Sequence, residues 1–294
     1  MNKNKVALVT GASRGIGKAT CMHLAKKGYD VVVTARSVNE HDTTSFPGTI
    51  TETAEMVRKL GRKALAIRCD VSSNDDIKRT FDKAMEAFGR IDVLVNNARY
   101  EGPAHWGAFT KTKWSEIEML MRCNVFGVLY MSQLVVPVMR KQKGGVIITL
   151  ASRSAQQENP NLPGAGSTGL FYPSSKAAIN RWIVGLMKEV KNDNISVVNV
   201  SPGSTLTERS TVDEGGKRGY DFTRRHSVHV PATCVTYIIT CPDPMLFAGR
   251  VIEAPDFVRE HFLMTPAELK SPFRDGEIYD PYKEPYWLKL KTGK

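Results

Sequence analysis

Tyr172 and Lys176 stand four residues apart and could carry out acid–base chemistry together. In a helix, residues i and i+4 lie on the same face, so the phenol and the ammonium group would be neighbours. A nearby positive charge favours the phenolate form of tyrosine, which helps the hydroxyl to exchange a proton at neutral pH. Pro173 fits only near the start of a helix, where its missing N–H costs no hydrogen bond. The spacing therefore predicts a proton-transfer pair at the start of a helix over residues 174–190.

A glycine-rich turn near the N-terminus could bind a phosphate. Its sequence, TGASRGIG over residues 10–17, lies between an apolar run and a helical pattern. Gly11 allows a tight turn out of a strand, Gly15 lets the backbone approach a pyrophosphate, and Gly17 lets helix and strand pack closely. The free N–H groups at the helix start attract an anion. The turn therefore predicts the phosphate site of a dinucleotide.

Further motifs occur in the order of one large family. TGASRGIG and the Tyr172–Lys176 pair resemble the cofactor and catalytic motifs of the short-chain dehydrogenase/reductase family, in its branch of single-domain oxidoreductases. The other matching elements are Asp70 in CDVS, Asn96-Asn97-Ala98, Asn124 in CNVFG, Ser152, and Pro202-Gly203 with Thr207. The resemblance covers residues 4–253, and motifs in a fixed order are more specific than any single one.

The resemblance implies four catalytic residues: Asn124, Ser152, Tyr172 and Lys176. Tyr172 would exchange a proton with the substrate, and Ser152 would hydrogen-bond the substrate oxygen. Lys176 would hold the ribose of the nicotinamide, and Asn124 would anchor a water that links Lys176 to solvent. The gap between Ser152 and Tyr172 is longer than is usual in the family, which indicates a loop insertion. Ser154 is the alternative to Ser152.

Cofactor contacts are implied for residues at the ends of several predicted strands. They are Gly11, Ser13, Arg14, Gly15, Ile16, Gly17, Arg36, Asp70, Val71, Asn97, Ala98, Tyr172, Lys176, Pro202, Gly203 and Thr207. An acidic residue after the second strand would hold the ribose hydroxyls of NAD, but Arg36 stands there. Arg36 and Arg14 can pair with a 2′-phosphate, because guanidinium groups suit phosphate. We expect NADP (NADPH) rather than NAD; the alternative is that both arginines are solvated surface charges.

Apolar, β-branched runs alternate with helical patterns over the first 200 residues. We expect strands at 6–10, 31–34, 64–69, 91–95, 145–150 and 196–200, and helices at 19–27, 51–60, 75–88, 113–139 and 174–190. Strands that are apolar on both faces and separated by helices form a parallel sheet covered on each side. The pattern predicts an α/β fold: a Rossmann-type doubly wound parallel sheet in three layers, as a single domain with a C-terminal extension.

The chain departs from the family pattern in three places. Arg99 replaces the usual glycine after Asn-Asn-Ala, and the polar loop 37–50 is longer than usual. Residues 254–294 follow the last family strand and carry many aromatic side chains, in which disordered segments are poor. We expect residues 1–253 to form the dinucleotide-binding and catalytic domain. The extension 254–294 would pack on the substrate cleft or a neighbouring subunit; the alternative is a loosely ordered tail.

The stretches 100–112, 153–171 and 204–230 would define the substrate. In the first of them, His105, Trp106 and Phe109 could line a pocket or could pack within the loop. Sequence does not choose between these alternatives, nor does it name the substrate.

Composition excludes several classes of protein. A chain of 294 residues, 41% apolar, can bury a large core without staples. The 41 Lys and Arg residues exceed the 30 Asp and Glu residues by 11, but without the run of like charges typical of a nucleic-acid arm. Five cysteines without zinc-ligand spacing indicate free thiols in a reducing compartment and no metal site. With no signal peptide and no apolar stretch approaching the ~18 residues of a membrane span, we expect a cytoplasmic protein.

The expected activity is NADP-dependent hydride transfer between NADPH and a carbonyl or secondary alcohol of a small molecule. Tyr172 would protonate the alkoxide, and Ser152 would help to stabilise it. Alternatives are reduction of a 3-oxoacyl group on a carrier protein or CoA, and a non-catalytic NADP-binding regulator. In the family the helices matching 113–139 and 174–190 pair between subunits, which implies a homotetramer or homodimer. We expect neither a nucleic acid nor a membrane as a partner.

Overall fold

The computed structural model describes residues 4–39, 42, 46–100, 102–156, 169–208 and 225–265, and every structural statement below concerns these residues. They form a parallel sheet of seven strands in the order β3-β2-β1-β4-β5-β6-β7. The strands are β1 (Val6–Thr10), β2 (Asp30–Ala35), β3 (Ala64–Arg68), β4 (Val93–Asn96), β5 (Gly145–Leu150), β6 (Ile195–Ser201) and β7 (Val251–Glu253). The strand order reverses between β1 and β4, and dinucleotides bind at such a switch point.

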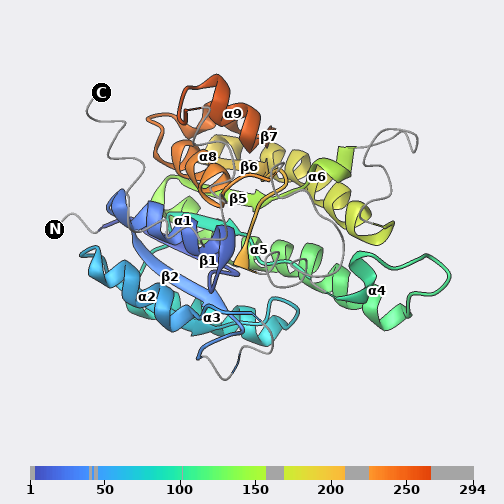
Figure 1. Cartoon of the computed structure of the whole chain (residues 1–294). Coiled ribbons are helices and arrows are strands. Elements are labelled where there is room, and N and C mark those ends of the chain that lie inside the picture. Colours follow the sequence, from blue (N-terminus) through green and yellow to red (C-terminus); the bar gives the residue numbers. More distant parts are fainter. Residues whose placement is uncertain are drawn as a thin grey trace.

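Helices cover both faces of the sheet, as predicted (Figure 1). They are α1 (Gly15–Lys26), α2 (Ile50–Lys59), α3 (Asn74–Phe88), α4 (Trp114–Met121), α5 (Gly127–Gln142), α6 (Phe171–Val190), α8 (His229–Thr240) and α9 (Ala254–Glu260). One core cluster joins α1, α2, α8 and α9 to the sheet, and a second joins α3, α5 and α6 to its other face. The three-layer α/β fold is therefore confirmed.

Hydroxyl side chains begin two of these helices at the positions expected of helix caps. Thr49 Oγ1 accepts a hydrogen bond from the N–H of Glu52 at the start of α2. Ser73 Oγ does the same for Asp76 at the start of α3. These bonds satisfy N–H groups that lack a partner within the helix. Gly89, with φ of 67°, ends α3.

The long helix predicted over 113–139 is interrupted. A π-helical turn, η3 (Arg122–Phe126), separates α4 from α5. A Cβ on Gly127 would overlap the main-chain oxygen of Val71, so the helix backbone contacts the turn after β3 here. The π-turn places Asn124 in the interior with no exposed surface. Such turns are frequent at functional sites.

Together α4, η3 and α5 form one helical segment of 29 residues, Trp114–Gln142. An 18-residue window of this segment has a mean hydropathy of 1.4, which by length and composition would suffice to cross a membrane. However, 56% of its apolar window is buried within the protein. Val135 and Met139, for example, pack in the second core cluster against the sheet. This burial is typical of the core helix of a doubly wound fold.

The first part of the predicted C-terminal extension packs on its own chain. Helix α9 lies against α8 (Figure 1), and Phe257, Val258 and Met264 belong to the first core cluster. Strand β7, which precedes α9, is a seventh strand beyond the six predicted, because three residues are too few for a visible pattern. The rest of the extension, 266–294, lies outside the described residues, as do the insertion 157–168 and the segment 209–224.

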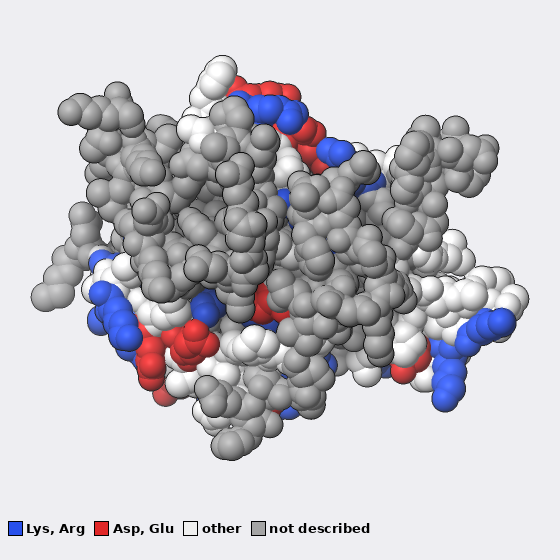
Figure 2. Space-filling view, viewed as in Figure 1, with Lys and Arg blue, Asp and Glu red and all other residues white. Residues whose placement is uncertain are grey.

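Charges of both signs are interspersed on the described part of the surface. Figure 2 shows Lys and Arg side chains beside Asp and Glu side chains over α2 and α9. Lys18 pairs with Glu52 on α2, and Arg259 pairs with Asp256 on α9.

Candidate functional site

The glycine-rich turn connects β1 to α1 and leaves no room for side chains. Gly11 and Gly15 have φ angles of 65° and 57°, which residues with a side chain rarely adopt. A Cβ on Gly17 would overlap the main-chain oxygen of Gly11 and lie 2.6 Å from Asn97 Nδ2. The surface of the turn is therefore made of backbone that a ligand can approach closely.

Asn97 and Thr10 hold this turn against the end of β4. Asn97 Nδ2 donates to the main-chain oxygens of Thr10, at 2.8 Å, and Gly11, at 3.0 Å. Thr10 Oγ1 accepts from the main-chain N–H groups of Asn97 and Ala98, both at 3.1 Å. These four bonds fix the carboxyl ends of β1 and β4 relative to each other at the switch point.

The carboxylate of Glu208 contacts the start of α1. The N–H of Gly15 donates to Glu208 Oε2 at 2.8 Å, where the helix dipole favours negative charge. Thr207 lies beside it, with Cγ2 3.2 Å from the position of a Cβ on Gly15. In the same turn Ser13 is buried and Ile16 packs on the core. Glu208 thus stands in for an anionic ligand, and these residues fit the pyrophosphate of a dinucleotide.

Two arginines lie near the end of β2. Arg14 Nη2 donates to Ser37 Oγ at 3.3 Å and to the main-chain oxygen of Gly48 at 3.0 Å. Arg36 directly precedes Ser37; its side chain is 67% exposed and Nη1 lies 4.0 Å from Asp70 Oδ2. The structure therefore brings both guanidinium groups to the loop after β2, where they can bind a second anionic group.

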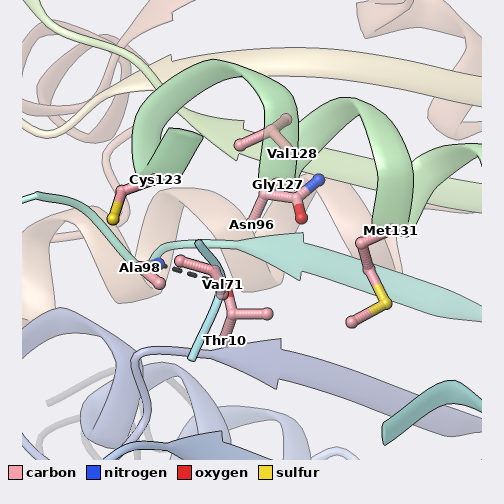
Figure 3. Close-up of a pocket in the computed structure, with 8 residues that line it drawn as sticks. All are labelled: Thr10, Val71, Asn96, Ala98, Cys123, Gly127, Val128 and Met131. Carbon is pink, nitrogen blue, oxygen red and sulfur yellow. Dashed lines mark hydrogen bonds between the residues drawn. The ribbon is translucent and has the colours of Figure 1, made fainter. Parts of the chain in front are cut away.

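A small cavity lies at the switch point between β1 and β4. It is lined by Thr10, Val71, Asn96, Ala98, Cys123, Gly127, Val128 and Met131. Figure 3 shows Val71, from the turn after β3, facing η3 and α5 across the ends of β1 and β4. Burial raises the pKa of the Cys123 thiol to about 11, which keeps the thiol neutral. Val71 and Ala98, two of the expected cofactor contacts, thus border the crevice where such sheets bind dinucleotides.

Pro202 and Gly203 follow β6 at the same edge of the sheet. Gly203 has a φ of 72°, and a Cβ there would lie 2.6 Å from Pro255 Cγ. Thr205 Oγ1 donates to the main-chain oxygen of Pro202 at 3.1 Å. This compact turn directs the chain from β6 back toward the glycine-rich turn, where Thr207 lies.

Tyr172 and Lys176 are buried in the first two turns of α6, which begins at Phe171. Lys176 Nζ lies over the ring of Tyr172, 5.8 Å from its centroid. It also donates to the main-chain oxygen of Leu150 at 2.6 Å. Because Leu150 is the last residue of β5, this bond ties the start of α6 to the carboxyl edge of the sheet. The ammonium group thus faces the phenol ring from the next turn of the same helix.

Asn124 links three elements around Tyr172. Its Oδ1 accepts from the N–H of Tyr100 at 2.7 Å, and its Nδ2 donates to Ser175 Oγ at 3.0 Å. Ser175 Oγ in turn donates to the main-chain oxygen of Tyr172 at 2.7 Å. The π-turn that carries Asn124 is thus connected through Ser175 to the first turn of α6.

Ser152 and Ser154 remain equivalent candidates by geometry. Their hydroxyl oxygens are 2.9 Å apart, and the N–H of Ser154 donates to Ser152 Oγ at 3.3 Å. Both follow β5, and the short helix η4 (Arg153–Gln156) packs against α6. The loop insertion expected before Tyr172 falls on residues 157–168, outside the described part of the chain.

Aromatic side chains of the segment after β4 gather around Tyr172. The ring of His105 stacks on the ring of Tyr172, with centroids 4.1 Å apart. Trp106 packs on His105 at 4.4 Å, and Phe109 stacks on Phe171 at 6.1 Å. Trp106 and Phe109 are 49% and 69% exposed. We call His105, Trp106, Phe109 and Phe171 the aromatic wall.

The contacts of three residues of this site could not be predicted from the sequence. Ser175 lies inside the motif that provides Tyr172 and Lys176, but its spacing carries no sign that it bonds Asn124. Tyr100 and Glu208 directly follow motif residues, and only the tertiary structure shows their contacts. Within the described ranges, no group of three or more His, Cys, Asp or Glu side chains could hold a metal ion.

The sequence is similar to those of several known proteins. The sequence model described as short chain dehydrogenase matches residues 5–215. The 7alpha-hydroxysteroid dehydrogenase of Escherichia coli (strain K12) is 32% identical over 204 residues, 69% of this chain and 72% of that protein. The 3-oxoacyl-[acyl-carrier-protein] reductase of Synechocystis sp. is 33% identical over 205 residues, 69% of this chain and 75% of that protein.

A solved structure extends the likeness to three dimensions. It is a 7 alpha-hydroxysteroid dehydrogenase in complex with NADH and 7-oxo glycochenodeoxycholic acid. It superposes with a TM-score of 0.69 and 28% sequence identity, over 85% of this chain and 92% of that chain. The family match over residues 5–215 includes the glycine-rich turn and Tyr172.

Proposed function

The chain belongs to the short-chain dehydrogenase family, an oxidoreductase family acting on CH–OH groups, and on that premise we propose an NADP-dependent carbonyl reductase or alcohol dehydrogenase. The observation that carries this proposal is the placement of Lys176 Nζ over the Tyr172 ring, 5.8 Å from its centroid, at the carboxyl edge of β5. A lysine in that place serves the proton chemistry of the tyrosine.

The proposed binding of the cofactor uses backbone and two arginines. The pyrophosphate would take the place of the Glu208 carboxylate at the N–H of Gly15. Arg14 and Arg36 would hold a 2′-phosphate beside the end of β2, which favours NADP, although the solved relative above is a complex with NADH. When bound, the nicotinamide supplies the hydride.

In the proposed mechanism, the protein transfers a proton to the substrate oxygen and hydrogen-bonds that oxygen. The Tyr172 hydroxyl donates its proton to the substrate oxygen as negative charge develops there. Ser152 donates a hydrogen bond to the same oxygen. The ammonium of Lys176 stabilises the phenolate that remains. Asn124, fixed by Tyr100 and Ser175, would anchor the water through which the phenolate regains a proton.

A second candidate is reduction of a 3-oxoacyl group on a carrier protein or CoA. The observation that favours it is the 33% identity with a 3-oxoacyl-[acyl-carrier-protein] reductase. Both candidates use the same catalytic group, so the substrate distinguishes them. The aromatic wall favours a small or medium-sized apolar carbonyl compound, because exposed aromatic side chains bury apolar ligand surface.

The test is consumption of NADPH or NADH by the purified full-length chain with a panel of ketones, aldehydes, steroid ketones and a 3-oxoacyl thioester. The proposal predicts turnover with NADPH and an apolar ketone, and slower turnover with NADH. Turnover with the thioester alone would select the second candidate. NADPH binding without turnover of any compound would contradict both candidates and favour a regulator.

We also propose that the chain forms a homodimer or homotetramer and works in the cytoplasm. The support is an exposed apolar surface on the helices expected to pair. Trp114, Met119 and Phe126 on the α4–η3 segment and Val184 on α6 are 71%, 42%, 54% and 51% exposed. Burying such side chains against a second copy would remove them from water. Light scattering of the purified chain would measure the mass, and a monomer would contradict the proposal.

A further inference from the structure

His105 lies on the ring of the tyrosine to which we assign the proton transfer. The ring centroids of His105 and Tyr172 are 4.1 Å apart and the planes are inclined by 23°. His105 is 2% exposed and Tyr172 is 7% exposed, so the stack is shielded from water. The two residues come from different elements, η2 (Pro103–His105) and α6. The contact therefore depends on how η2 is held.

Hydrogen bonds to Gly102 and Tyr100 hold η2 in place. The N–H of His105 donates to the main-chain oxygen of Gly102 at 3.0 Å. The N–H of Ala104 donates to the Tyr100 hydroxyl at 3.4 Å, and that hydroxyl donates to Glu116 Oε2 on α4. A Cβ on Gly102 would overlap the Tyr100 ring, so the segment passes closely over Tyr100.

Tyr100 also connects η2 to Asn124 and, through it, to the first turn of α6. Its main-chain N–H donates to Asn124 Oδ1 at 2.7 Å, and Asn124 reaches the first turn of α6 through Ser175. The backbone of Tyr172 and the ring that covers its side chain are thus anchored to the same residue. A shift of η2 would move the stacked ring relative to the helix.

We propose that His105 is a positioning residue, which holds the Tyr172 ring in the orientation from which its hydroxyl meets the substrate oxygen. This inference rests on the proposed role of Tyr172. Lys176 bounds the phenol ring with a single ammonium group, whereas the flat imidazole covers a ring face and limits rotation of the phenol. Proton transfer requires a closely defined geometry. A Tyr172 ring that can rotate therefore lowers the rate of proton transfer without weakening the binding of the cofactor.

The test compares three substitutions at one position. His105→Phe keeps a flat ring that can stack, while His105→Leu and His105→Ala remove it. We expect His105→Phe to keep kcat within about threefold, and the other two to lower kcat by about 10- to 100-fold, the scale of a misplaced catalytic group. NADPH affinity, from the fluorescence of the bound cofactor, should be unchanged in all three.

A matched control removes a similar stack elsewhere. His261, which directly follows α9, stacks on Phe257 with centroids 4.0 Å apart and an inclination of 26°. His261→Ala should therefore leave kcat unchanged. On a Tyr172→Phe background, His105→Leu should cause no additional loss, because the residue that it positions no longer transfers a proton.

Other outcomes would overturn the positioning role. Wild-type kcat in His105→Leu, equal losses in His105→Phe and His105→Leu, or a parallel loss of NADPH affinity would each contradict it. If His105→Ala does not fold, the comparison of His105→Leu with His105→Phe still decides. A failure of the proposed function looks different, since Tyr172→Phe would then retain the activity of the wild type.

Discussion

The carboxylate of Glu208 accepts a hydrogen bond of 2.8 Å from the N–H of Gly15, at the first residue of α1. Free N–H groups at a helix start bind anions, and the glycine-rich turn provides the close approach that a pyrophosphate needs. On the proposed function, Glu208 and the cofactor phosphates would compete for this site, and Glu208 would then lower the affinity for the cofactor.

Glu208→Gln should strengthen NADPH binding. The neutral amide is a poorer ligand for the helix start than a carboxylate and does not repel phosphate. A charge at a helix terminus contributes about 0.3–1 kcal/mol, so we expect the Kd to fall by about two- to fivefold. Fluorescence titration measures the Kd, and Glu260→Gln on exposed α9 is the control. Weaker binding by Glu208→Gln would show that Glu208 supports the cofactor site instead.

Arg36→Asp should reverse or abolish the preference for NADP. The Arg36 side chain is 67% exposed, and its substitution removes the ion pair with Asp70. We expect the Kd for NADPH to rise by about tenfold or more, because a charge-assisted phosphate contact is replaced by repulsion. The Kd for NADH should change little. Lys83→Asp, at an exposed position in the middle of α3, controls for net charge; equal losses for both cofactors would contradict the assignment.

Separate alanine substitutions should decide between Ser152 and Ser154. Their hydroxyl oxygens lie 2.9 Å apart, so the structure does not choose between them. We expect Ser152→Ala to lower kcat by about 100-fold, the usual effect of losing an oxyanion donor, and Ser154→Ala to lower it only a few-fold. The reverse order in a steady-state assay would assign the role to Ser154.

The buried pair of His23 and His229 should make the fold sensitive to acid. His23 Nε2 and His229 Nδ1 are 2.9 Å apart between α1 and α8. Burial lowers the pKa of His229 to about 4 and holds that of His23 well below its ordinary value of 6.5. Both histidines are neutral in the folded chain, but in the unfolded chain they take up protons below pH 6.5. The free energy of unfolding therefore has its full value above pH 6.5 and falls as the pH drops toward 4.

Each of the two histidines can contribute a slope of up to about 1.4 kcal/mol per pH unit within that window. Urea unfolding at a series of pH values measures it. His229→Gln removes one titrating group, and should flatten the dependence of the unfolding free energy on pH. An unchanged slope in this variant would mean that other groups dominate acid unfolding.

Most of the sheet could be predicted from the sequence because its strands are apolar on both faces. Val31–Val33 and Ile147–Ile148 are completely buried, and such runs have no other stable environment. Periodicity did not predict strand β7, since three residues do not form a pattern, and only the family resemblance places a last strand before residue 254. The π-turn at Asn124 could not be predicted either, because the spacing of apolar residues through 113–139 is that of one continuous helix.

In the candidate site, too, some features could be predicted from the sequence and others could not. The glycine-rich turn and the Tyr172–Lys176 pair follow from local spacing, so their neighbours along the chain could be assigned. The stack of His105 on Tyr172 joins residues from two elements, and the bond from Glu208 to Gly15 spans most of the chain. Such contacts depend on packing, which local patterns do not encode.

The central claim is that Tyr172 transfers the proton that accompanies hydride transfer. The direct measurement is kcat of Tyr172→Phe with NADPH and the best ketone substrate of the wild type, together with the Kd for NADPH. Loss of the hydroxyl should lower kcat by about 100-fold or more, the scale of general acid catalysis, while the Kd changes little. A variant that retains most of the wild-type kcat would contradict the account.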